Sequence, residues 1–174
     1  RGLTTMVLCF EDSCIAEDVP KAELNSIHLL DVLLDEIEKG TISYTEIPLI
    51  IFRVRNYEEF LHFSDMLQPR HVKLICAFNF PKFNKSNGRQ YFQKLQELNL
   101  RFGEPIYGMP ILEDVTIAHK ESRVSELLGI KGILDEYKEL VLNIRVGGTD
   151  FSACFGVRRN INYTIYDIIT VSDC

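Results

Sequence analysis

The segment PLIIFRVRN, residues 48–56, decides the fold of this chain. Successive side chains of a strand point to opposite faces, so the segment divides into two sets. One face carries Leu49, Ile51, Arg53 and Arg55, and the other carries Ile50, Phe52 and Val54. The second face is apolar throughout, which predicts a strand covered by helices on that side. The first face ends in two arginines, which predicts a polar site where the strand ends.

Apolar, β-branched runs of the same kind alternate with longer amphipathic segments along the whole chain. Five strands are expected, at Thr5–Asp12, Pro48–Arg55, Val72–Lys82, Ile106–Glu113 and Leu140–Gly147. This alternation predicts an α/β fold with a parallel sheet. It fits a TIM (β/α)8 barrel and an open doubly wound sheet equally well. The chain has no GxGxxG or GxxxxGK[ST] motif after the first strand, which weighs against a nucleotide-binding open sheet.

Helices are expected between the strands from their capping residues and apolar spacing. Their expected bounds are Asn25 to Gly40, Asn56 to Leu67 with a capping box from Glu59, Ser86 to Gly103, Glu121 to Tyr137 with interruptions at Gly129 and Gly132, and a last helix capped by Thr164 and Asp167. No linker or low-complexity tract separates them, so residues 1–174 are expected to form one domain.

The composition limits the classes of function. The chain has a net charge of −6, which argues against a nucleic-acid partner because nucleic-acid affinity needs clustered Lys and Arg. No apolar run is long enough to span a bilayer, so a membrane role is not expected. The five cysteines show no CxxC spacing, which predicts reduced thiols in a cytoplasmic protein with no disulfide and no structural zinc. The start at Arg1 and the end at Cys174 predict a fragment of a longer chain.

Polar residues gather where the expected strands end. They are Glu11 and Asp12, then Arg53 and Arg55, then Pro81 and Lys82, then Glu113 and Asp114, and finally Gly147, Gly148, Thr149 and Asp150. Ligands bind at the carboxyl ends of strands in both candidate folds. Arg145 shares a face with Asn143 on the last strand and adds another cation. Either salt bridges to these acids or an anionic ligand accounts for the arginines, because a buried cation needs an anionic partner.

Glu113 and Asp150 end consecutive strands, so we expect their side chains to converge. Two carboxylates together with water and a bidentate ligand are a usual way to hold Mg²⁺. Gly147 and Gly148 come just before Asp150, and they either let a substrate approach the backbone closely or form a simple turn.

At these strand ends the sequence resembles the citrate lyase beta subunit and its HpcH/HpaI aldolase relatives. The matching elements are MVLCFED at Met6–Asp12, FRVRN at Phe52–Asn56, FPKF at Phe80–Phe83, MPILED at Met109–Asp114 and GGTDFSACFG at Gly147–Gly156. The longer pattern is most similar to the bacterial carbon-carbon bond lyase-like branch associated with tellurium-resistance clusters. The resemblance implies a TIM barrel of which this chain is an incomplete central portion with about five parallel strands. The first, seventh and eighth strands then lie outside the chain.

The resemblance also implies residue roles and a chemistry. Glu113 and Asp150 are the implied Mg²⁺ ligands, and Arg53 is implied to bind the substrate's carboxylate. Substrate contacts are further expected from Arg55, Lys82, Arg145, Gly147 and Gly148, while Glu11 and Asp12 hold metal-bound waters or orient the arginines. The implied reaction is cleavage of a carbon-carbon bond in an oxo-acid, with the metal stabilising an enolate.

Departures from the family pattern bear on the substrate. Arg55 replaces the usual Asn, Asp114 replaces the usual Thr, and Arg145 adds positive charge, so a small, strongly anionic organic acid is expected as the partner. A homo-oligomer is expected as well. Two other functions stay open, namely a non-catalytic barrel that binds an acidic metabolite and a synthase that condenses an acyl thioester with an oxo-acid.

Overall fold

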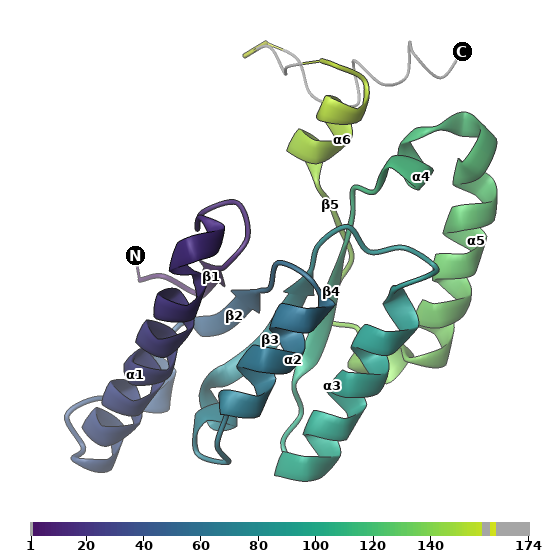
Figure 1. The fold of residues 1–174 in the computed structure, drawn as a ribbon. Helices are drawn as coiled ribbons and strands as arrows, with labels where there is room; N and C mark the ends of the chain where they lie inside the picture. The colour runs from purple at the N-terminus through teal and green to yellow at the C-terminus, as the bar shows by residue number, and fades with distance from the viewer. Residues whose placement is uncertain (1, 158–160, 163–174) are drawn as a thin grey trace.

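Five parallel strands form the sheet of the computed structural model, which describes residues 2–157 and 161–162. They are β1 (Thr5–Cys9), β2 (Leu49–Arg53), β3 (Ile75–Phe80), β4 (Tyr107–Leu112) and β5 (Arg145–Val146). Their spatial order is the same as their order in the chain, β1-β2-β3-β4-β5 (Figure 1). A doubly wound sheet reverses its strand order at a switch point, so the observed order excludes that alternative. The fold is an incomplete TIM barrel, as the sequence predicts.

Helices connect the strands and cover one face of the sheet (Figure 1). The α-helices are α1 (Val19–Glu38), α2 (Tyr57–Met66), α3 (Gly88–Phe102), α4 (Val115–Ala118), α5 (Lys120–Glu136) and α6 (Gly148–Cys154). Short 3-10 turns lie at Ala16–Asp18, Tyr44–Glu46, His71–Leu74 and Lys138–Leu140. The longer helices α1, α2, α3 and α5 pack against the sheet, whereas α6 stands beyond the carboxyl end of β5.

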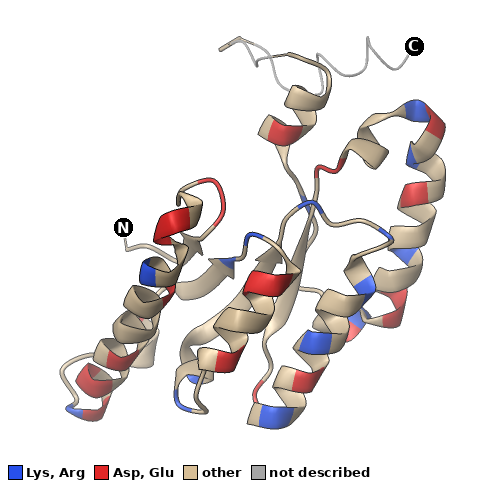
Figure 2. Ribbon diagram, in the orientation of Figure 1, with Lys and Arg blue, Asp and Glu red and all other residues tan. Residues whose placement is uncertain are grey.

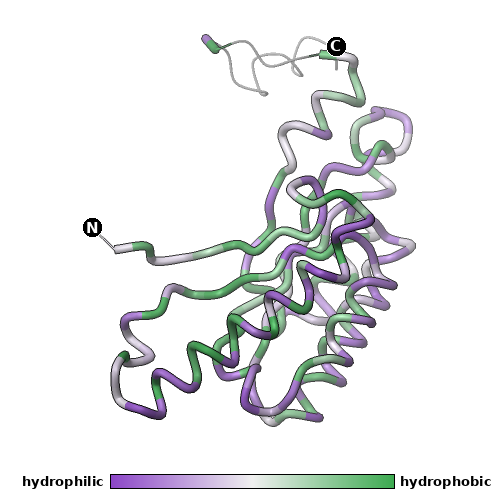
Figure 3. Tube along the Cα trace, turned by 60° about the vertical axis from the view of Figure 1, so that its left-hand side comes forward, coloured by the Kyte–Doolittle hydropathy of each residue, from purple (hydrophilic) through white to green (hydrophobic). Residues whose placement is uncertain are grey.

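The two faces of the sheet have separate apolar clusters. Ile50, Phe52 and Val54 belong to the large cluster between sheet and helices, together with fully buried rings such as Phe60 and Phe78. The smaller cluster comprises Ile51, Ala77 and Met109, and it defines what we call the concave face. The period-two division of residues 49–54 is therefore confirmed. Along the tube of Figure 3 the strands are mostly hydrophobic while the helices alternate, as elements with one solvent-facing side do.

Charged residues lie mainly on the outer helices and on the loops at the strand ends (Figure 2). The strands themselves are largely uncharged, except for arginines such as Arg53 at the end of β2. The carboxyl ends of the strands are therefore where charge meets the apolar body of the sheet. Within the described ranges, none of the helices combines the length and the apolar character that crossing a bilayer requires.

Several expected bounds are wrong. The first helix begins at Val19 and not at Asn25, because Pro20 suits a first helical turn, where no backbone N–H is needed. The third strand begins at Ile75, after a 3-10 turn at His71–Leu74. The fifth strand has two residues, Arg145–Val146, and Leu140 belongs to the 3-10 turn before it.

The segment 121–137 is also more regular than expected. Residues 121–136 lie in one continuous helix, α5, which Gly129 and Gly132 do not interrupt, and Tyr137 follows its last residue. A Cβ atom at Gly129 would lie 2.8 Å from Cβ of Lys85, so this glycine lets a neighbouring loop approach the helix closely. A packing requirement, and not a break in the helix, accounts for Gly129.

Two helix ends confirm the predictions from local sequence. The side chain of Asn56 accepts a hydrogen bond from the backbone N–H of Glu59 at 2.9 Å and so caps α2. The Glu59 carboxylate does not complete the capping box, since it accepts from the backbone N–H of Arg55 instead. Gly103 ends α3 in the left-handed conformation, with φ of 72°. The helix expected from Thr164 lies outside the described residues.

Candidate active site

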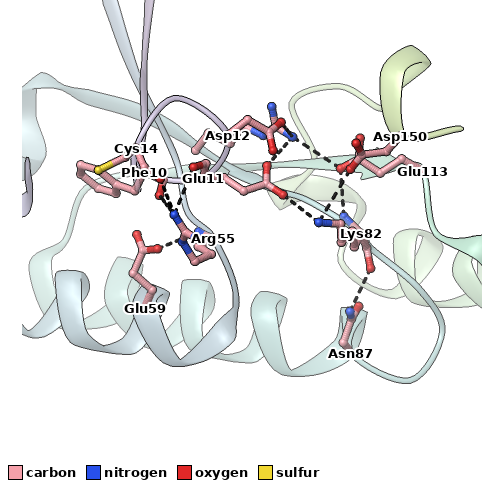
Figure 4. Close-up of polar contacts among 11 residues, drawn as sticks. Phe10, Glu11, Asp12, Cys14, Arg55, Glu59, Lys82, Asn87, Glu113 and Asp150 are labelled. Atoms are coloured by element: carbon pink, nitrogen blue, oxygen red, sulfur yellow. Dashed lines mark hydrogen bonds and ion pairs between the residues drawn. The ribbon is translucent and has the colours of Figure 1, made fainter. Parts of the chain in front are cut away.

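Three carboxylates converge at the carboxyl ends of the strands. Glu11 follows β1, Glu113 follows β4, and Asp150 lies in the first turn of α6. One oxygen from each lies within 4.8 Å of the others. Glu11 and Glu113 are buried, with 5% and 4% of their surfaces exposed, and Asp150 is partly exposed. The expected convergence of Glu113 and Asp150 is therefore present, and Glu11 joins them (Figure 4).

Two cations hold this group of carboxylates together. Arg53, at the end of β2, forms ion pairs through Nη2 with Glu11, with Asp12 at 3.3 Å and with Glu113 at 3.6 Å. Lys82, after β3, places Nζ 3.1 Å from Glu11 and 3.7 Å from Asp150. Four strand ends and α6 thus supply one charge cluster, which no segment forms alone.

The backbone at Lys82 is shaped to support Glu113. Lys82 has a positive φ of 48°, which is uncommon for a residue with a side chain. In this conformation its N–H donates to Oε1 of Glu113 at 3.2 Å, and its carbonyl accepts from Nδ2 of Asn87 at 3.0 Å. The turn therefore directs both the N–H and the ammonium of Lys82 toward the carboxylates.

Gly147 packs against Glu113 so closely that a side chain would not fit. A Cβ atom at Gly147 would lie 1.6 Å from Oε2 of Glu113. The backbone N–H of Gly147 donates to the carbonyl of Leu112 at 3.2 Å and fixes this approach. The sequence predicts a close approach here by a substrate or a turn, and the group that approaches in the structure is Glu113. Gly148 starts α6, and its carbonyl accepts from the Ser152 hydroxyl at 2.7 Å.

Arg55 supports the loop that carries Glu11. Its Nη2 donates to the backbone carbonyls of Phe10 at 3.2 Å, Glu11 at 3.2 Å and Cys14 at 2.5 Å. In Figure 4 Arg55 and Glu59 lie on one side of Glu11, while Lys82, Glu113 and Asp150 lie on the other. The Nη2 of Arg55 thus donates hydrogen bonds to backbone carbonyls in this structure. Its expected contact with a substrate stays a prediction.

Arg145 lies nearer the amino ends of the strands than the charge cluster does, since it pairs with Ile111, two residues before Glu113. Ile111 is buried on the same face as Met109, and the side chain of Arg145 is exposed. Its position places it on the concave face, two residues before Gly147. Its expected contact with a substrate also stays a prediction.

Burial changes the protonation equilibria of two residues in the cluster. Burial raises the pKa of Glu113 above its usual value, against the lowering effects of the Lys82 N–H and the Arg53 charge. Burial lowers the pKa of Lys82, but the hydrogen bond to Glu11 and the charges of Glu11, Asp150 and Glu113 outweigh it and raise the pKa overall. The ammonium of Lys82 thus stays protonated as a partner for the acids.

A cavity of about 510 Å³ opens beside the cluster. Its lining combines the charged groups with small apolar side chains, and comprises Lys82, Glu113, Asp114, Val115, Asp150, Ala153 and Cys154. Asp114 also caps α4 by accepting from the N–H of Thr116 at 2.9 Å. The size and the mixture of apolar walls with a few polar groups suit a small organic molecule.

The donor set fits a hard divalent cation. Glu11, Glu113 and Asp150 offer only carboxylate oxygens, and Mg²⁺ prefers oxygen ligands while softer metals prefer nitrogen and sulfur. The resemblance implies that Glu11 holds metal-bound waters or orients the arginines, whereas the structure places its carboxylate beside those of Glu113 and Asp150. Only the curvature of the sheet brings it to Glu113.

The comparisons with known proteins agree with this architecture. Residues 1–174 match the family described as C-C bond lyase of the TIM-barrel fold. Among the curated proteins, none matches the chain. The match covers the complete sequence, including every strand end that contributes to the charge cluster. The chain therefore belongs to the C-C bond lyase family of TIM-barrel fold.

Proposed function

We propose that this protein is a magnesium-dependent carbon-carbon lyase of the aldolase type, similar to the citrate lyase beta subunit, and that it acts on a small anionic oxo-acid. The observation that carries the proposal is the meeting of Glu11, Glu113 and Asp150, whose oxygens lie within 4.8 Å of one another beside Arg53. Membership of a family of C-C bond lyases supports the reaction class. The oxygen-only donor set supports the choice of metal.

Each residue of the site has a role that follows from its position. Glu113 and Asp150, joined by Glu11, would hold the Mg²⁺, which when bound supplies a Lewis acid that polarises the carbonyl of the oxo-acid. The planar guanidinium of Arg53 binds the substrate's carboxylate with two parallel hydrogen bonds. The ammonium of Lys82 adds a second positive charge at the cavity wall.

Together with a bound Mg²⁺, the cations near the site would outweigh the carboxylates and so support an anionic substrate. Arg53 and Lys82 both contact the cluster, and Arg145 lies further along the same concave face. A dicarboxylic or phosphorylated oxo-acid carries enough negative charge to match them. The free thiols of Cys9, Cys14, Cys76 and Cys154 support a cytoplasmic setting, since reduced cysteines are typical of that compartment.

A substrate screen with and without metal tests the proposal. The protein is incubated with oxo-acids and phospho-oxo-acids in Mg²⁺ or in EDTA, and the cleavage products are followed by NMR. We expect turnover only in the samples that contain Mg²⁺. The turnover rate of Glu113→Gln should be lower by at least about a hundredfold, because Gln keeps the shape of the side chain but removes a ligand charge. Calorimetry should show a matching fall in Mg²⁺ affinity.

Glu139→Gln is the matched control, since this side chain is 88% exposed and lies on a 3-10 turn away from the cluster. It should leave both turnover and Mg²⁺ affinity unchanged. Equal Mg²⁺ affinity in the wild-type protein and Glu113→Gln would contradict the proposed site. Binding of an acid without cleavage would favour a metabolite-binding barrel, and turnover only with an acyl thioester would favour a synthase; either result contradicts the lyase proposal.

A further inference from the structure

Asn79 is a buried polar residue that has no partner for its side chain among the described residues. It lies in β3, it is 0% exposed, and neither Oδ1 nor Nδ2 forms a hydrogen bond. Leaving the donor and acceptor of a buried amide without hydrogen bonds destabilises the folded state. A leucine would fit the apolar surroundings better, so stability alone gives no reason for an amide at this position.

The position of Asn79 connects it with the candidate active site. In the sheet Asn79 pairs in register with Arg53 of β2 and with Met109 of β4. Met109 and the neighbouring Ala77 lie in the concave-face cluster. Paired residues of adjacent strands point to the same face and are separated by about 5 Å. Asn79 is therefore next to Arg53 on the concave face.

Arg53 has a complementary buried group without a partner. Its Nη2 forms the ion pairs with Glu11, Asp12 and Glu113, while its Nε is buried and forms no hydrogen bond. An Nε–H is a donor only, and Oδ1 of Asn79 is an acceptor only. Adjacent strands thus present one unused donor and one unused acceptor at register partners on the same face of the sheet.

We propose that Asn79 is a positioning residue for Arg53, and that its Oδ1 accepts a hydrogen bond from the Nε–H of Arg53. This bond fixes the plane of the guanidinium and leaves the two terminal nitrogens to meet anions, as Nη2 already does with Glu11, Asp12 and Glu113. A planar fork recognises a carboxylate only in a narrow range of orientations, so fixing that plane lowers the entropy lost on binding. The inference rests on the proposed function in one respect, because it takes the anion to be the oxo-acid's carboxylate.

The substitution Asn79→Leu separates this role from a purely structural one. Leucine has a similar volume and needs no hydrogen bond, which offsets the loss of an acceptor for the Arg53 Nε–H, so the thermal midpoint should change little. Binding of pyruvate, measured by calorimetry with Mg²⁺ present, should weaken about tenfold, which is the equivalent of one hydrogen bond to a charged group. Met109→Leu is the matched control, since it changes the other register partner of Asn79 without removing a polar group, and it should leave pyruvate binding unchanged.

A spectroscopic measurement tests the bond without any ligand. The guanidinium Nε–H signal of Arg53, assigned by its disappearance in Arg53→Lys, should exchange slowly with solvent in the wild-type protein and in Met109→Leu, and faster in Asn79→Leu. Equal exchange in all three would overturn the inference, as would a fall in stability of Asn79→Leu with unchanged pyruvate affinity. If the wild-type protein binds neither pyruvate nor the dicarboxylic oxo-acid oxaloacetate while the exchange rates differ as expected, the inference about Asn79 stands and the proposed substrate class fails.

Discussion

Glu59 is expected to make the stability of the protein depend on pH. It lies in the first turn of α2 with 9% of its surface exposed, Oε2 accepts from the N–H of Arg55 at 2.9 Å, and Oε1 is buried without a hydrogen bond. Burial raises its pKa from the usual 4.5 to about 7, the Arg55 N–H opposes this, and the charge of Glu23 adds to it. The folded protein therefore binds a proton at this site more tightly than the unfolded chain does.

The sign and size follow from that difference. Because the pKa is higher in the folded state, the stability from this group is fully present below the unfolded pKa near 4.5 and is lost as the pH rises through about 7. The difference between these pKa values corresponds to about 3 kcal/mol as an upper limit. Between pH 5 and pH 8 the wild-type protein should lose about 2.5 kcal/mol more unfolding free energy than Glu59→Gln, whose side chain does not titrate.

Urea unfolding of both proteins at pH 5 and pH 8 measures this difference directly. Glu58→Gln is the matched control, because Glu58 lies in the same helical turn but is exposed, and its pH profile should follow that of the wild-type protein. Parallel profiles for the wild-type protein and Glu59→Gln would refute the reasoning. They would mean that the Glu59 carboxylate is solvated or paired in the folded state.

Three further substitutions address the site. Gly147→Ala should lower the Mg²⁺ affinity measured by calorimetry at least about tenfold, because the new Cβ must displace Glu113. In the control Gly132→Ala the new Cβ has free space, so the free energy of unfolding measured in urea should rise by about 0.5–1 kcal/mol. Arg55→Met should cost about 1–3 kcal/mol and speed hydrogen exchange of residues 10–14, because three carbonyls lose their donor; unchanged exchange would contradict this role. Arg53→Lys should weaken pyruvate binding about tenfold, since one ammonium does not replace a bidentate fork, and equal binding would place the carboxylate site elsewhere.

The fold was predictable where the local pattern and the tertiary role agree. The alternation in residues 49–54 identifies both faces of β2, and the structure assigns Phe52 and Ile51 to the two clusters accordingly. Asn56 caps its helix through a contact within three residues, so its signal is also local. Strand order was not predictable from the pattern, because both parallel architectures give the same alternation of strands and helices.

The weaker predictions concern features that depend on distant parts of the chain. Residues 140–147 have the composition of a strand, but only Arg145–Val146 pair with β4, because the preceding residues turn through a 3-10 helix. Gly129 looks like a helix breaker until the neighbouring Lys85 is considered. The positive φ of Lys82 accompanies its hydrogen bonds to Asn87 and Glu113, and no local sequence motif predicts it.

The site also shows why single strand ends are poor evidence for function. Glu113 is enclosed from two sides, because the Lys82 N–H donates to Oε1 and the backbone at Gly147 packs closely against Oε2. Glu11 is supported separately, through the loop carbonyls that Arg55 holds. Three carboxylates at such short separations repel one another, and the two cations Arg53 and Lys82 leave these five residues with a net charge of −1. Asp12, which also pairs with Arg53, adds a further negative charge. The net negative charge of these closely spaced carboxylates is the physical reason for proposing a divalent metal between them.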